Sequence, residues 1–383
     1  MSHVLNSSLK YLEKLVGFDT QNPPRAISQE SDIFKYIQSH LSGFTFEFFD
    51  AGEGCIALLA VRGNPQILFN FHIDTVPVAP GWNTQPHKLQ VVEDKAFGLG
   101  ACDIKGAAAC MLTAANQTKA PLALLFSSDE EHGNSAAIKF FVGHDSFIKY
   151  NFKQVIVAEP TQCQAVIAHR GIQSAKVSFM GVSGHASESR AISDNAIHKA
   201  SLWANNAISW ITSQNFKFDN LSGLPFNIGK VEGGIKANMI AADCEMAFGF
   251  RPLPGQSAEK ILESLLELSP SKETTKIFAG FSGPSLPASN QNFDSALESA
   301  TNFANNLNIP LGKAVNFWTE ASLFSQSGLT AIVYGPGDIA QAHTPDEWVL
   351  LSELETVTEK YISIIEQDQK STTLHQQAME VTS

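Results

Sequence analysis

The stretch PLALLFSSDEEHGNS, residues 121–135, joins a short apolar run to three consecutive carboxylates and a histidine. The apolar run has the length and composition of a buried strand. Asp129, Glu130 and Glu131 follow it directly, and negative charges beside a core repel one another unless a cation or a proton lies among them. A solvated acidic turn is the alternative interpretation. The choice depends on whether other parts of the chain supply further ligands.

Short apolar runs alternate with helical stretches around this segment. The predicted strands are residues 66–74, 122–128 and 154–160. The predicted helices between them are residues 104–117 and 135–144. Strands that alternate with helices are typical of an α/β domain with a mostly parallel sheet.

The pattern of predicted elements changes after HRGI, residues 169–172. The order strand, helix, strand, strand, helix, strand predicts a small two-layer α+β domain of the ferredoxin-like kind, inserted into the first domain. We therefore expect an α/β domain of residues 1–170 and 283–383 and an insertion of residues 171–282. The polar composition of residues 368–383 predicts a frayed tail.

Composition limits the class of protein. The chain has 383 residues, 44% of them hydrophobic, and a net charge of −12 without a Lys/Arg-rich segment, which argues against nucleic acid or a membrane surface as partner. Its five cysteines are an odd number without CxxC spacing, which favours a reducing cytoplasm over a disulfide framework. The N-terminal residues predict an amphipathic helix and no secretory leader, and no apolar run approaches the roughly 18 residues of a membrane span.

Further possible ligands stand near other predicted strand ends. His72 and Asp74 are two residues apart in one predicted strand and so point to one face, where the carboxylate can orient the imidazole. Asp103 lies in the glycine-rich loop GLGACDIKG, Glu159 follows a predicted strand, and His343 lies in a late loop. In an open α/β sheet the strand ends border the ligand crevice, so all these groups can line one edge.

This donor set contains carboxylates and imidazoles and no thiolate. Such donors suit two divalent ions better than a structural zinc site, and zinc, cobalt and manganese all fit them. Two ions need a bridging carboxylate, and such pairs activate water for hydrolysis. One of two adjacent glutamates can then bind metal while its neighbour moves protons. The acidic run therefore predicts a hydrolytic two-metal site in preference to a surface turn.

Eight motifs occur in order across nearly the whole chain. They are HIDTVP, GLGACDIKG, SSDEEHG, VAEPT, GVSGHAS, RPLPG, FWTEASLF and YGPGDIAQAHTPDEW. Together they resemble the acetylornithine deacetylase group of the di-zinc M20 metallopeptidase family. The resemblance implies an amidohydrolase that removes the acetyl group from an N-acetylated amino acid of arginine biosynthesis. FDTQNPPRAI and FNIGKVEGGIKANMIA are most similar to the branch acting on N-acetyl-L-citrulline, with N-acetyl-L-ornithine as the alternative substrate.

The resemblance also implies how the ligands divide between two metal ions, with zinc the favoured metal. His72, Asp103 and Glu159 would bind one ion, and Asp103, Glu131 and His343 the other. Asp103 would bridge the pair.

Other residues take roles from the same resemblance. Glu130 would be the general acid and base, and Asp74 would orient His72. The insertion would form a homodimer in which His185 reaches the partner's site and polarises the scissile carbonyl. Arg251 and Asn238 would hold the substrate's carboxylate and the reacting oxygens.

Other interpretations stay open from the residues alone. His185 can be an ordinary surface histidine, and Arg251 can serve a structural ion pair. A metal-dependent dipeptidase, a desuccinylase and a catalytically silent binding relative are the other candidate functions. The silent relative is disfavoured because no ligand position and no general-base position is replaced, and RPLPG and TEASLF favour the deacetylase group over the desuccinylase. The sequence does not identify which residues contact the substrate's side-chain end.

Overall fold

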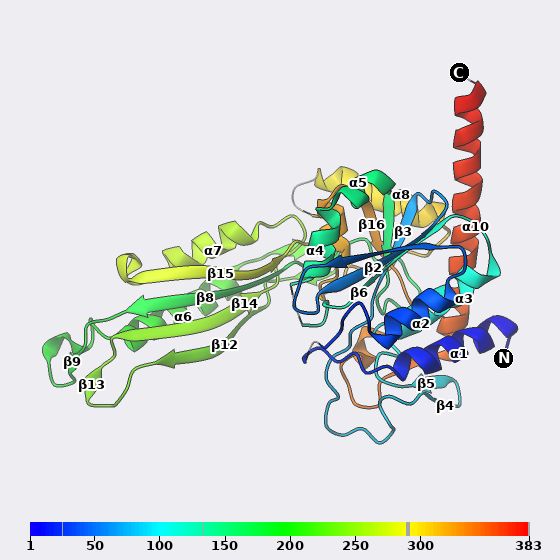
Figure 1. Cartoon of the computed structure of the whole chain (residues 1–383). Helices are drawn as coiled ribbons and strands as arrows, with labels where there is room; N and C mark the ends of the chain where they lie inside the picture. The colour runs from blue at the N-terminus through cyan, green and yellow to red at the C-terminus, as the bar shows by residue number, and fades with distance from the viewer. Residues whose placement is uncertain (25, 133, 289–291, 382–383) are drawn as a thin grey trace. The chain divides into compact units, whose positions relative to one another are not determined.

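The computed structural model describes residues 1–24, 26–132, 134–288 and 292–381, which form two compact units (Figure 1). Unit 1 consists of Met1–Ile167, Asp294–Gly312 and Thr319–Ser383. Unit 2 consists of Ala168–Phe293 and Lys313–Trp318. Unit 2 therefore contains all of the stretch from 171 to 282, a few residues on either side of it, and the separate segment Lys313–Trp318.

Unit 1 is built on a six-stranded sheet in the order β1-β2-β6-β3-β7-β16. The strands are β1 (Thr45–Asp50), β2 (Ile56–Arg62), β3 (Ile67–His72), β6 (Leu122–Ser127), β7 (Gln154–Val157) and β16 (Thr330–Val333). The four strands from β6 to β16 are parallel, whereas β2 and β1 add an antiparallel edge. The predicted α/β fold with a mostly parallel sheet is confirmed.

Helices cover both faces of this sheet. One core contains side chains from α1 (His3–Val16), α2 (Asp32–His40), α3 (Lys105–Gln117), α8 (Phe293–Asn306) and α10 (Leu351–Val381). The other face contacts α4 (Ala136–Val142) and α9 (Ala321–Gln326), and α5 (Asp145–Tyr150) packs on α4. Alternation along β3 separates the faces: Phe71 packs edge-on against Tyr361 of α10, and Asn70 contacts Glu320 at the start of α9.

Smaller elements complete unit 1. A three-stranded sheet has the order β17 (Trp348–Leu350), β5 (Lys95–Phe97) and β4 (Gln90–Val92), and a short 3₁₀ turn, η3, spans Ile339–Gln341. The predicted tail is wrong as far as Val381, because α10 continues through it. The segment contains neither proline nor glycine and is rich in good helix formers such as Leu, Gln, Ala, Met and Glu, so nothing in it stops the helix.

Unit 2 has the predicted order of elements, and its α+β, ferredoxin-like fold is confirmed. The elements are β8 (Ile172–Met180), α6 (Ala196–Ser213), β12 (Phe226–Gly233), β14 (Asp243–Phe250), α7 (Ala258–Glu267) and β15 (Thr275–Gly283). The strands form an antiparallel sheet in the order β12-β14-β8-β15. Val177 and Phe179 of β8 pack in one core with Trp203 of α6, while Lys176 and Ser178 point to the opposite face.

Short strands extend this unit. β9 (Gly184–His185) pairs with β13 (Met239–Ile240), and β10 (Lys217–Phe218) pairs with β11 (Leu221–Ser222). Two 3₁₀ turns, η1 (Ser189–Ala191) and η2 (Lys272–Thr274), lie in the connections.

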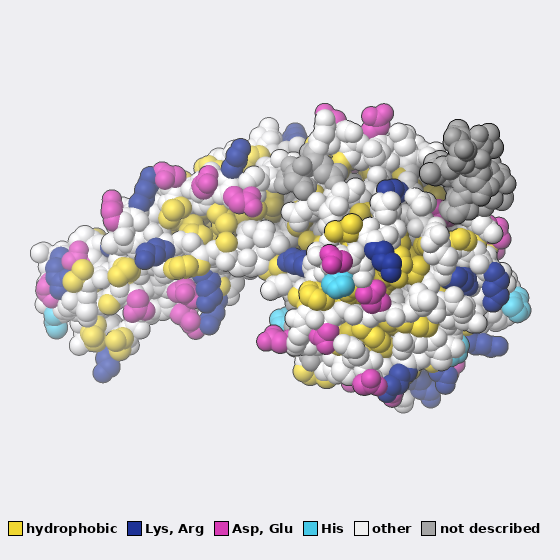
Figure 2. Space-filling model, turned by 45° about the horizontal axis from the view of Figure 1, so that its top comes forward, with side chains coloured by type: hydrophobic (Ala, Val, Ile, Leu, Met, Phe, Trp, Pro, Cys, Tyr) yellow, Lys and Arg dark blue, Asp and Glu magenta, His cyan; other side chains and the backbone are white. Residues whose placement is uncertain are grey.

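Charged side chains of both signs are interspersed over the face drawn in Figure 2. This mixture agrees with a surplus of acidic residues that is spread along the chain. Within the described residues, no helix is both long and apolar enough to cross a membrane.

Candidate active site

Three parallel strands deliver acidic residues and a histidine to one edge of the unit 1 sheet. β3 lies between β6 and β7, so the carboxyl ends of the three strands are neighbours. His72 is the last residue of β3, Glu130 and Glu131 follow β6, and Glu159 follows β7. The chain leaves β3 for β6 on one side and later reaches β7 on the other, which makes this edge a switch point of the kind that binds ligands in open α/β sheets.

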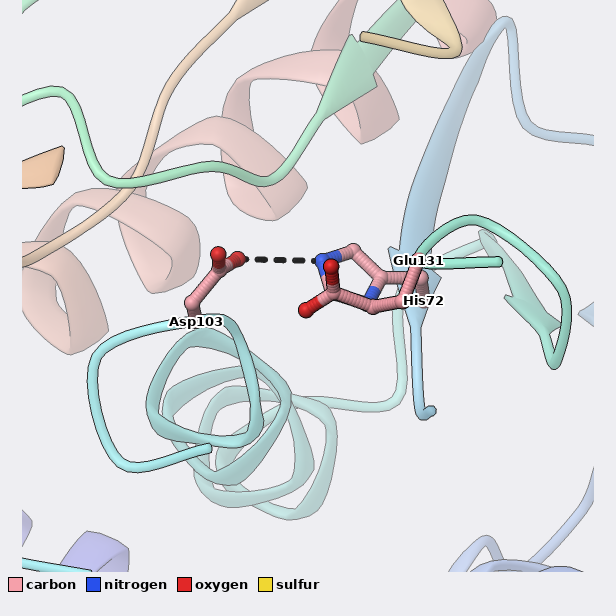
Figure 3. A group of neighbouring side chains, drawn as sticks. All are labelled: His72, Asp103 and Glu131. Atoms are coloured by element: carbon pink, nitrogen blue, oxygen red, sulfur yellow. Dashed lines mark hydrogen bonds and ion pairs between the residues drawn. The ribbon is translucent and has the colours of Figure 1, made fainter. Parts of the chain in front are cut away.

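Asp103 reaches the same edge from the loop that precedes α3. Its Oδ1 lies 3.1 Å from Nε2 of His72. One ligand atom from each of His72, Asp103 and Glu131 lies within 4.8 Å of the other two. Figure 3 shows the three side chains converging from the end of β3, from the loop just before α3 and from the loop after β6. The structure therefore brings together residues that are far apart in the sequence.

His343 approaches the other side of Asp103. It lies in the loop after β16, and its Nε2 is 2.9 Å from Oε2 of Glu131 and 3.4 Å from Oδ2 of Asp103. The two histidines thus face different oxygens of one carboxylate. That is the arrangement expected of a carboxylate that bridges two cations, each of which also binds one imidazole.

Glu159 is buried at this edge, and Glu130 lies half-buried beside it. Burial raises the pKa of Glu159 well above its usual range, and the negative charge of nearby Asp103 adds to the rise. Burial likewise raises the pKa of Glu130, and Glu131 adds to the rise although the positive charge of His72 opposes it. A carboxyl group with a raised pKa is suited to accept and return a proton near neutral pH.

The electrostatics of these groups fit bound cations. Hydrogen bonds to Asp103 and Glu131 raise the pKa of His343 to about 11. Burial works to lower the pKa of His72, but hydrogen bonds to Asp103 and Asp74, together with the negative charges of Glu159 and Asp103, outweigh burial and raise it well above its usual range. The carboxylates thus attract positive charge strongly, and they and the imidazoles are the oxygen and nitrogen donors that divalent ions such as zinc bind.

Asp74 orients His72 through a different atom from the one expected. β3 ends at His72, so Asp74 lies beyond the strand, and the expectation that both side chains belong to one strand is wrong. Nδ1 of His72 is 3.0 Å from the backbone carbonyl oxygen of Asp74 and 3.6 Å from its Oδ1. The Asp74 carboxylate instead accepts hydrogen bonds from Nδ2 of Asn22, at 2.8 Å, and from the backbone N–H of Glu131, at 3.1 Å. The strand therefore gives way to an irregular segment in which Asp74 contacts both the histidine and the acidic loop.

Glu347 supports the Asp103 loop and was missed by the sequence analysis. Its buried carboxylate accepts hydrogen bonds from the backbone N–H groups of Gly100, Cys102 and Asp103, at 3.0, 2.8 and 2.9 Å. An acid four residues after His343 in the HTPDE motif was the available signal. Nothing in the sequence indicated that this acid faces the glycine-rich loop, about 245 positions earlier.

Glu320 of the TEASLF motif was quoted in the sequence but given no role. Its Oε2 accepts hydrogen bonds from Nδ2 of Asn70, at 2.7 Å, and from Oγ of Ser127, at 2.9 Å. Burial raises the pKa of Glu320 to about 7, and the negative charge of Asp129 contributes. This acid ties β3 and β6 together directly behind the edge that carries the proposed ligands.

The remaining candidate residues belong to unit 2. His185 is exposed in β9, where its Nδ1 lies 2.7 Å from Oγ of Ser187. Asn238 precedes β13, and its carbonyl oxygen accepts a hydrogen bond from the N–H of Ala186 at 3.1 Å, so His185 and Asn238 share one two-stranded corner. Arg251 follows β14 and lines a hollow in the sheet. The roles of His185, Asn238 and Arg251 stay predictions.

Comparison with known proteins agrees with this geometry. Residues 68–367 match the model of peptidase family M20/M25/M40. The chain is 46% identical over 367 residues to the N-acetyl-L-citrulline deacetylase of Xanthomonas campestris pv. campestris, covering 95% of this chain and 99% of that protein. It is 29% identical to the acetylornithine deacetylase of Myxococcus xanthus, covering 92% and 95% of the two chains.

Solved structures show the same fold. The aminopeptidase PepT of Bacillus cereus superposes with a TM-score of 0.72 at 19% identity, over 95% of this chain and 98% of that one. The YXEP protein of Bacillus subtilis, described as a dinuclear metal-binding peptidase of the M20 family, gives 0.65 at 13% identity over 96% and 99%. The resemblance seen in the sequence motifs is confirmed, and this chain belongs to peptidase family M20/M25/M40.

Proposed function

We propose that this protein is a metal-dependent amidohydrolase that converts N-acetyl-L-citrulline to acetate and L-citrulline. The observation that carries the proposal is the placement of His72 and His343 at opposite oxygens of Asp103, with buried Glu159 and half-buried Glu130 and Glu131 completing the set of acids. The identity of 46% over nearly the full length to an N-acetyl-L-citrulline deacetylase supports this choice of substrate. A place in arginine biosynthesis follows from the same likeness.

Five side chains would hold the two metal ions. His72 and Glu159 would bind one ion, Glu131 and His343 the other, and Asp103 would bridge them. Zinc is the proposed metal, with cobalt and manganese as alternatives that suit the same donors. When bound, such an ion pair supplies an activated water and polarises the acetyl carbonyl.

The chain's own groups then move the protons and hold the substrate. Glu130 accepts the proton of the attacking water and returns it to the leaving nitrogen as the C–N bond breaks. His185 donates a hydrogen bond to the carbonyl oxygen as negative charge develops there. Arg251 binds the substrate's carboxylate through its planar guanidinium, and Asn238 contacts the reacting oxygens. Asp74 and Glu347 position the groups that act.

A homodimer formed through unit 2 is part of the proposal. β12 is an edge strand of the unit 2 sheet, and Val231 on it is exposed. Leu202 and Ile208 of α6 are exposed as well. Unpaired strand edges and exposed apolar side chains are common sites of association, which supports a second copy as the partner.

The cytoplasm is the proposed location. All five cysteines are free thiols, as expected in a reducing compartment. The mixed surface charge supports a small-molecule substrate and no nucleic acid or membrane partner.

N-acetyl-L-ornithine is the second candidate substrate, because several relatives at about 30% identity are acetylornithine deacetylases. A dipeptidase remains an alternative on the fold alone, and a silent binding protein is disfavoured by the complete set of acids and histidines.

Steady-state kinetics on the purified protein test the proposal. We expect acetate release from N-acetyl-L-citrulline to exceed release from N-acetyl-L-ornithine, and a dipeptide such as glycyl-citrulline to be a poor substrate. Chelation should abolish the activity, and zinc or cobalt should restore it. Full activity after exhaustive chelation would exclude the two-metal mechanism, and a preference for N-acetyl-L-ornithine would reverse the choice of substrate.

A further inference from the structure

The segment that carries His185 folds back on the imidazole of that residue. Nδ1 of His185 lies 2.7 Å from Oγ of Ser187 and accepts a hydrogen bond from the backbone N–H of Ser187 over 3.3 Å. Nε2 of the exposed ring makes no hydrogen bond to any residue that the structure describes. The two ring nitrogens therefore differ: one is bonded within the segment, and the other is available to a ligand.

The backbone donor decides which nitrogen of a neutral His185 carries the proton. The N–H of Ser187 can donate and cannot accept, so a second N–H at Nδ1 would point its hydrogen at another hydrogen. Nδ1 must then be an acceptor, and the Ser187 hydroxyl can turn its O–H towards the same lone pair. The ring proton is left on Nε2. A neutral imidazole in this tautomer donates from Nε2, as a carbonyl oxygen that becomes negative requires.

The same segment holds the backbone of His185. Oε1 of Glu188 accepts a hydrogen bond from the backbone N–H of His185 at 2.8 Å. The guanidinium of Arg190 binds both oxygens of Glu188, at 2.8 and 3.3 Å. It also donates to the carbonyl oxygens of Val182 and Ser183, at 3.1 and 3.0 Å. Because a guanidinium is planar and rigid, these contacts together restrict the shape of the segment.

A close approach at Gly184 completes this arrangement. A Cβ at this position would overlap Nη2 of Arg190 and Oε1 of Glu188, so only glycine lets the ion pair lie directly against the backbone. On the other side, β9 pairs with β13 and places His185 opposite Met239. The backbone of His185 is therefore held from two sides. Rotation of the imidazole is the remaining freedom, and the bond to Nδ1 restricts it.

We propose that Ser187 is a positioning residue for the hydrolysis: its hydroxyl and its N–H hold Nδ1 of His185, so that Nε2 keeps the proton that it offers to the acetyl carbonyl oxygen. The inference rests on the proposed deacetylase function and adds the reason why a neutral histidine can act as the donor. Ser187 contacts no reacting atom and acts through His185. Loss of its hydroxyl leaves the backbone donor in place, so the expected effect on turnover is partial.

A double-mutant cycle tests whether Ser187 acts through His185. Ser187→Ala should lower kcat for N-acetyl-L-citrulline about tenfold with KM within twofold of the parent, because the bond to the carbonyl strengthens only as negative charge develops. Ser187→Thr keeps the hydroxyl and should retain most of the parental kcat. In a His185→Ala chain, Ser187→Ala should change the residual kcat by less than about twofold. The control Ser189→Ala removes an exposed hydroxyl from the same segment and should leave kcat unchanged.

Nitrogen NMR on the whole protein with isotope-labelled histidine reports the tautomer without reference to activity. The signals of His185 are identified by their absence from His185→Ala. At a pH where the ring is neutral, the parent should show a protonated Nε2 and an unprotonated Nδ1. Ser187→Ala should show a larger share of the other tautomer, because one of the two donors to Nδ1 is lost.

The contrary results are distinct. A protonated Nδ1 in the neutral parent would overturn the inference and leave the deacetylase function standing. So would a parental kcat in Ser187→Ala, an equal loss in Ser189→Ala, or a loss of the same size with and without His185. A His185→Ala chain with parental kcat would overturn the role of His185, and a parent that hydrolyses neither acetylated amino acid would overturn the proposed function; either would remove the inference as well.

Discussion

The two units present their candidate functional groups in opposite environments. In unit 1, His72 and Asp103 are only 2% and 6% exposed, and the acids beside them have pKa values displaced by burial and by one another. In unit 2, His185 and Asn238 lie on an exposed corner, and Arg251 borders an open hollow. Buried like charges destabilise a fold unless a cation compensates them, whereas exposed polar groups are hydrated. The fold of unit 1 should therefore depend on bound metal for its stability, and the fold of unit 2 should not.

The units also contrast in their buried titratable groups. In unit 1, burial raises the pKa of Glu320 to about 7. In unit 2, burial lowers the pKa of His169 to about 4. Burial disfavours the charged form of both groups, one an acid and one a base, so their contributions to stability should respond to pH in opposite directions.

The largest expected effect separates two adjacent glutamates of unit 1. Glu130→Gln should lower kcat at least a thousandfold because the proton carrier is lost, while two metal ions per chain are retained. Glu131→Gln should instead lose metal, because a ligand is removed. The measurement is the metal content and the kcat of both variants. Loss of metal from Glu130→Gln would mean that the two roles are exchanged.

The next prediction tests whether unit 2 of one chain serves unit 1 of another. Inactive His185→Ala and Glu130→Gln chains are refolded together, and about half of the dimers should then be mixed. Each mixed dimer has one complete composite site, so about a quarter of the parental activity should return. His198→Ala, which removes another exposed histidine of the same unit, should keep full activity.

An absence of recovery has a definite meaning in this experiment. If mass measurement shows mixed dimers and the activity stays at the level of the separate variants, His185 does not act on the partner's site. The interpretation of His185 as a surface histidine would then stand.

Metal removal should act on unit 1 alone. Ligands that bind only the folded state at 100 to 1,000 times their Kd stabilise it by about 3–4 kcal/mol, so chelation should cost that much. Hydrogen exchange should show the loss in β3 and β6 and unchanged protection in β8 and β14. Equal loss of protection in both units would remove the proposed contrast.

Glu320 should give unit 1 a stability that falls as the pH rises. Its folded-state pKa, about 7, lies above its usual value of 4.5. The unfolded chain releases this proton above pH 4.5 while the folded chain retains it, so the contribution is complete below pH 4.5 and is lost by pH 7. In metal-free protein, Glu320→Gln should remove up to about 3 kcal/mol of this pH dependence, measured by urea unfolding. If the unfolding free energy of Glu320→Gln depends on pH as strongly as that of the parent, other acids cause the dependence.

His169 should give unit 2 an effect of opposite sign and similar size. Its folded-state pKa, about 4, lies below its usual 6.5, so only the unfolded chain takes up a proton between these values. Its contribution is therefore present above pH 6.5 and is lost as the pH falls towards 4. His169→Gln should flatten that decline by up to about 3 kcal/mol. The hydrogen bond that is lost between Nδ1 and the Arg170 carbonyl oxygen should lower stability equally at every pH. A steeper decline in the variant would contradict the assignment.

Much of the fold could be predicted from the sequence because the patterns that indicate it are local. The alternation of apolar runs with helical stretches identified the α/β part, and the order of strands and helices identified the α+β part. Boundaries were less accurate: β3 ends at His72, two residues before the predicted end, and α10 continues into the predicted tail. The hydrogen bonds of Asp74 set the end of β3, and helix propensity extends α10. A prediction based on polarity alone includes neither effect.

The sequence by itself determined which residue types were available at the strand ends, and the family motifs assigned them to a metal pair. Only the tertiary structure decided that β3 lies between β6 and β7, that His72 and His343 face opposite oxygens of Asp103, and that Glu347 holds the Asp103 loop. The physical reason is the range of the interactions. Periodicity along a chain reflects contacts within a few residues, whereas strand order and convergence of side chains depend on pairing between segments far apart, whose partners no local pattern specifies.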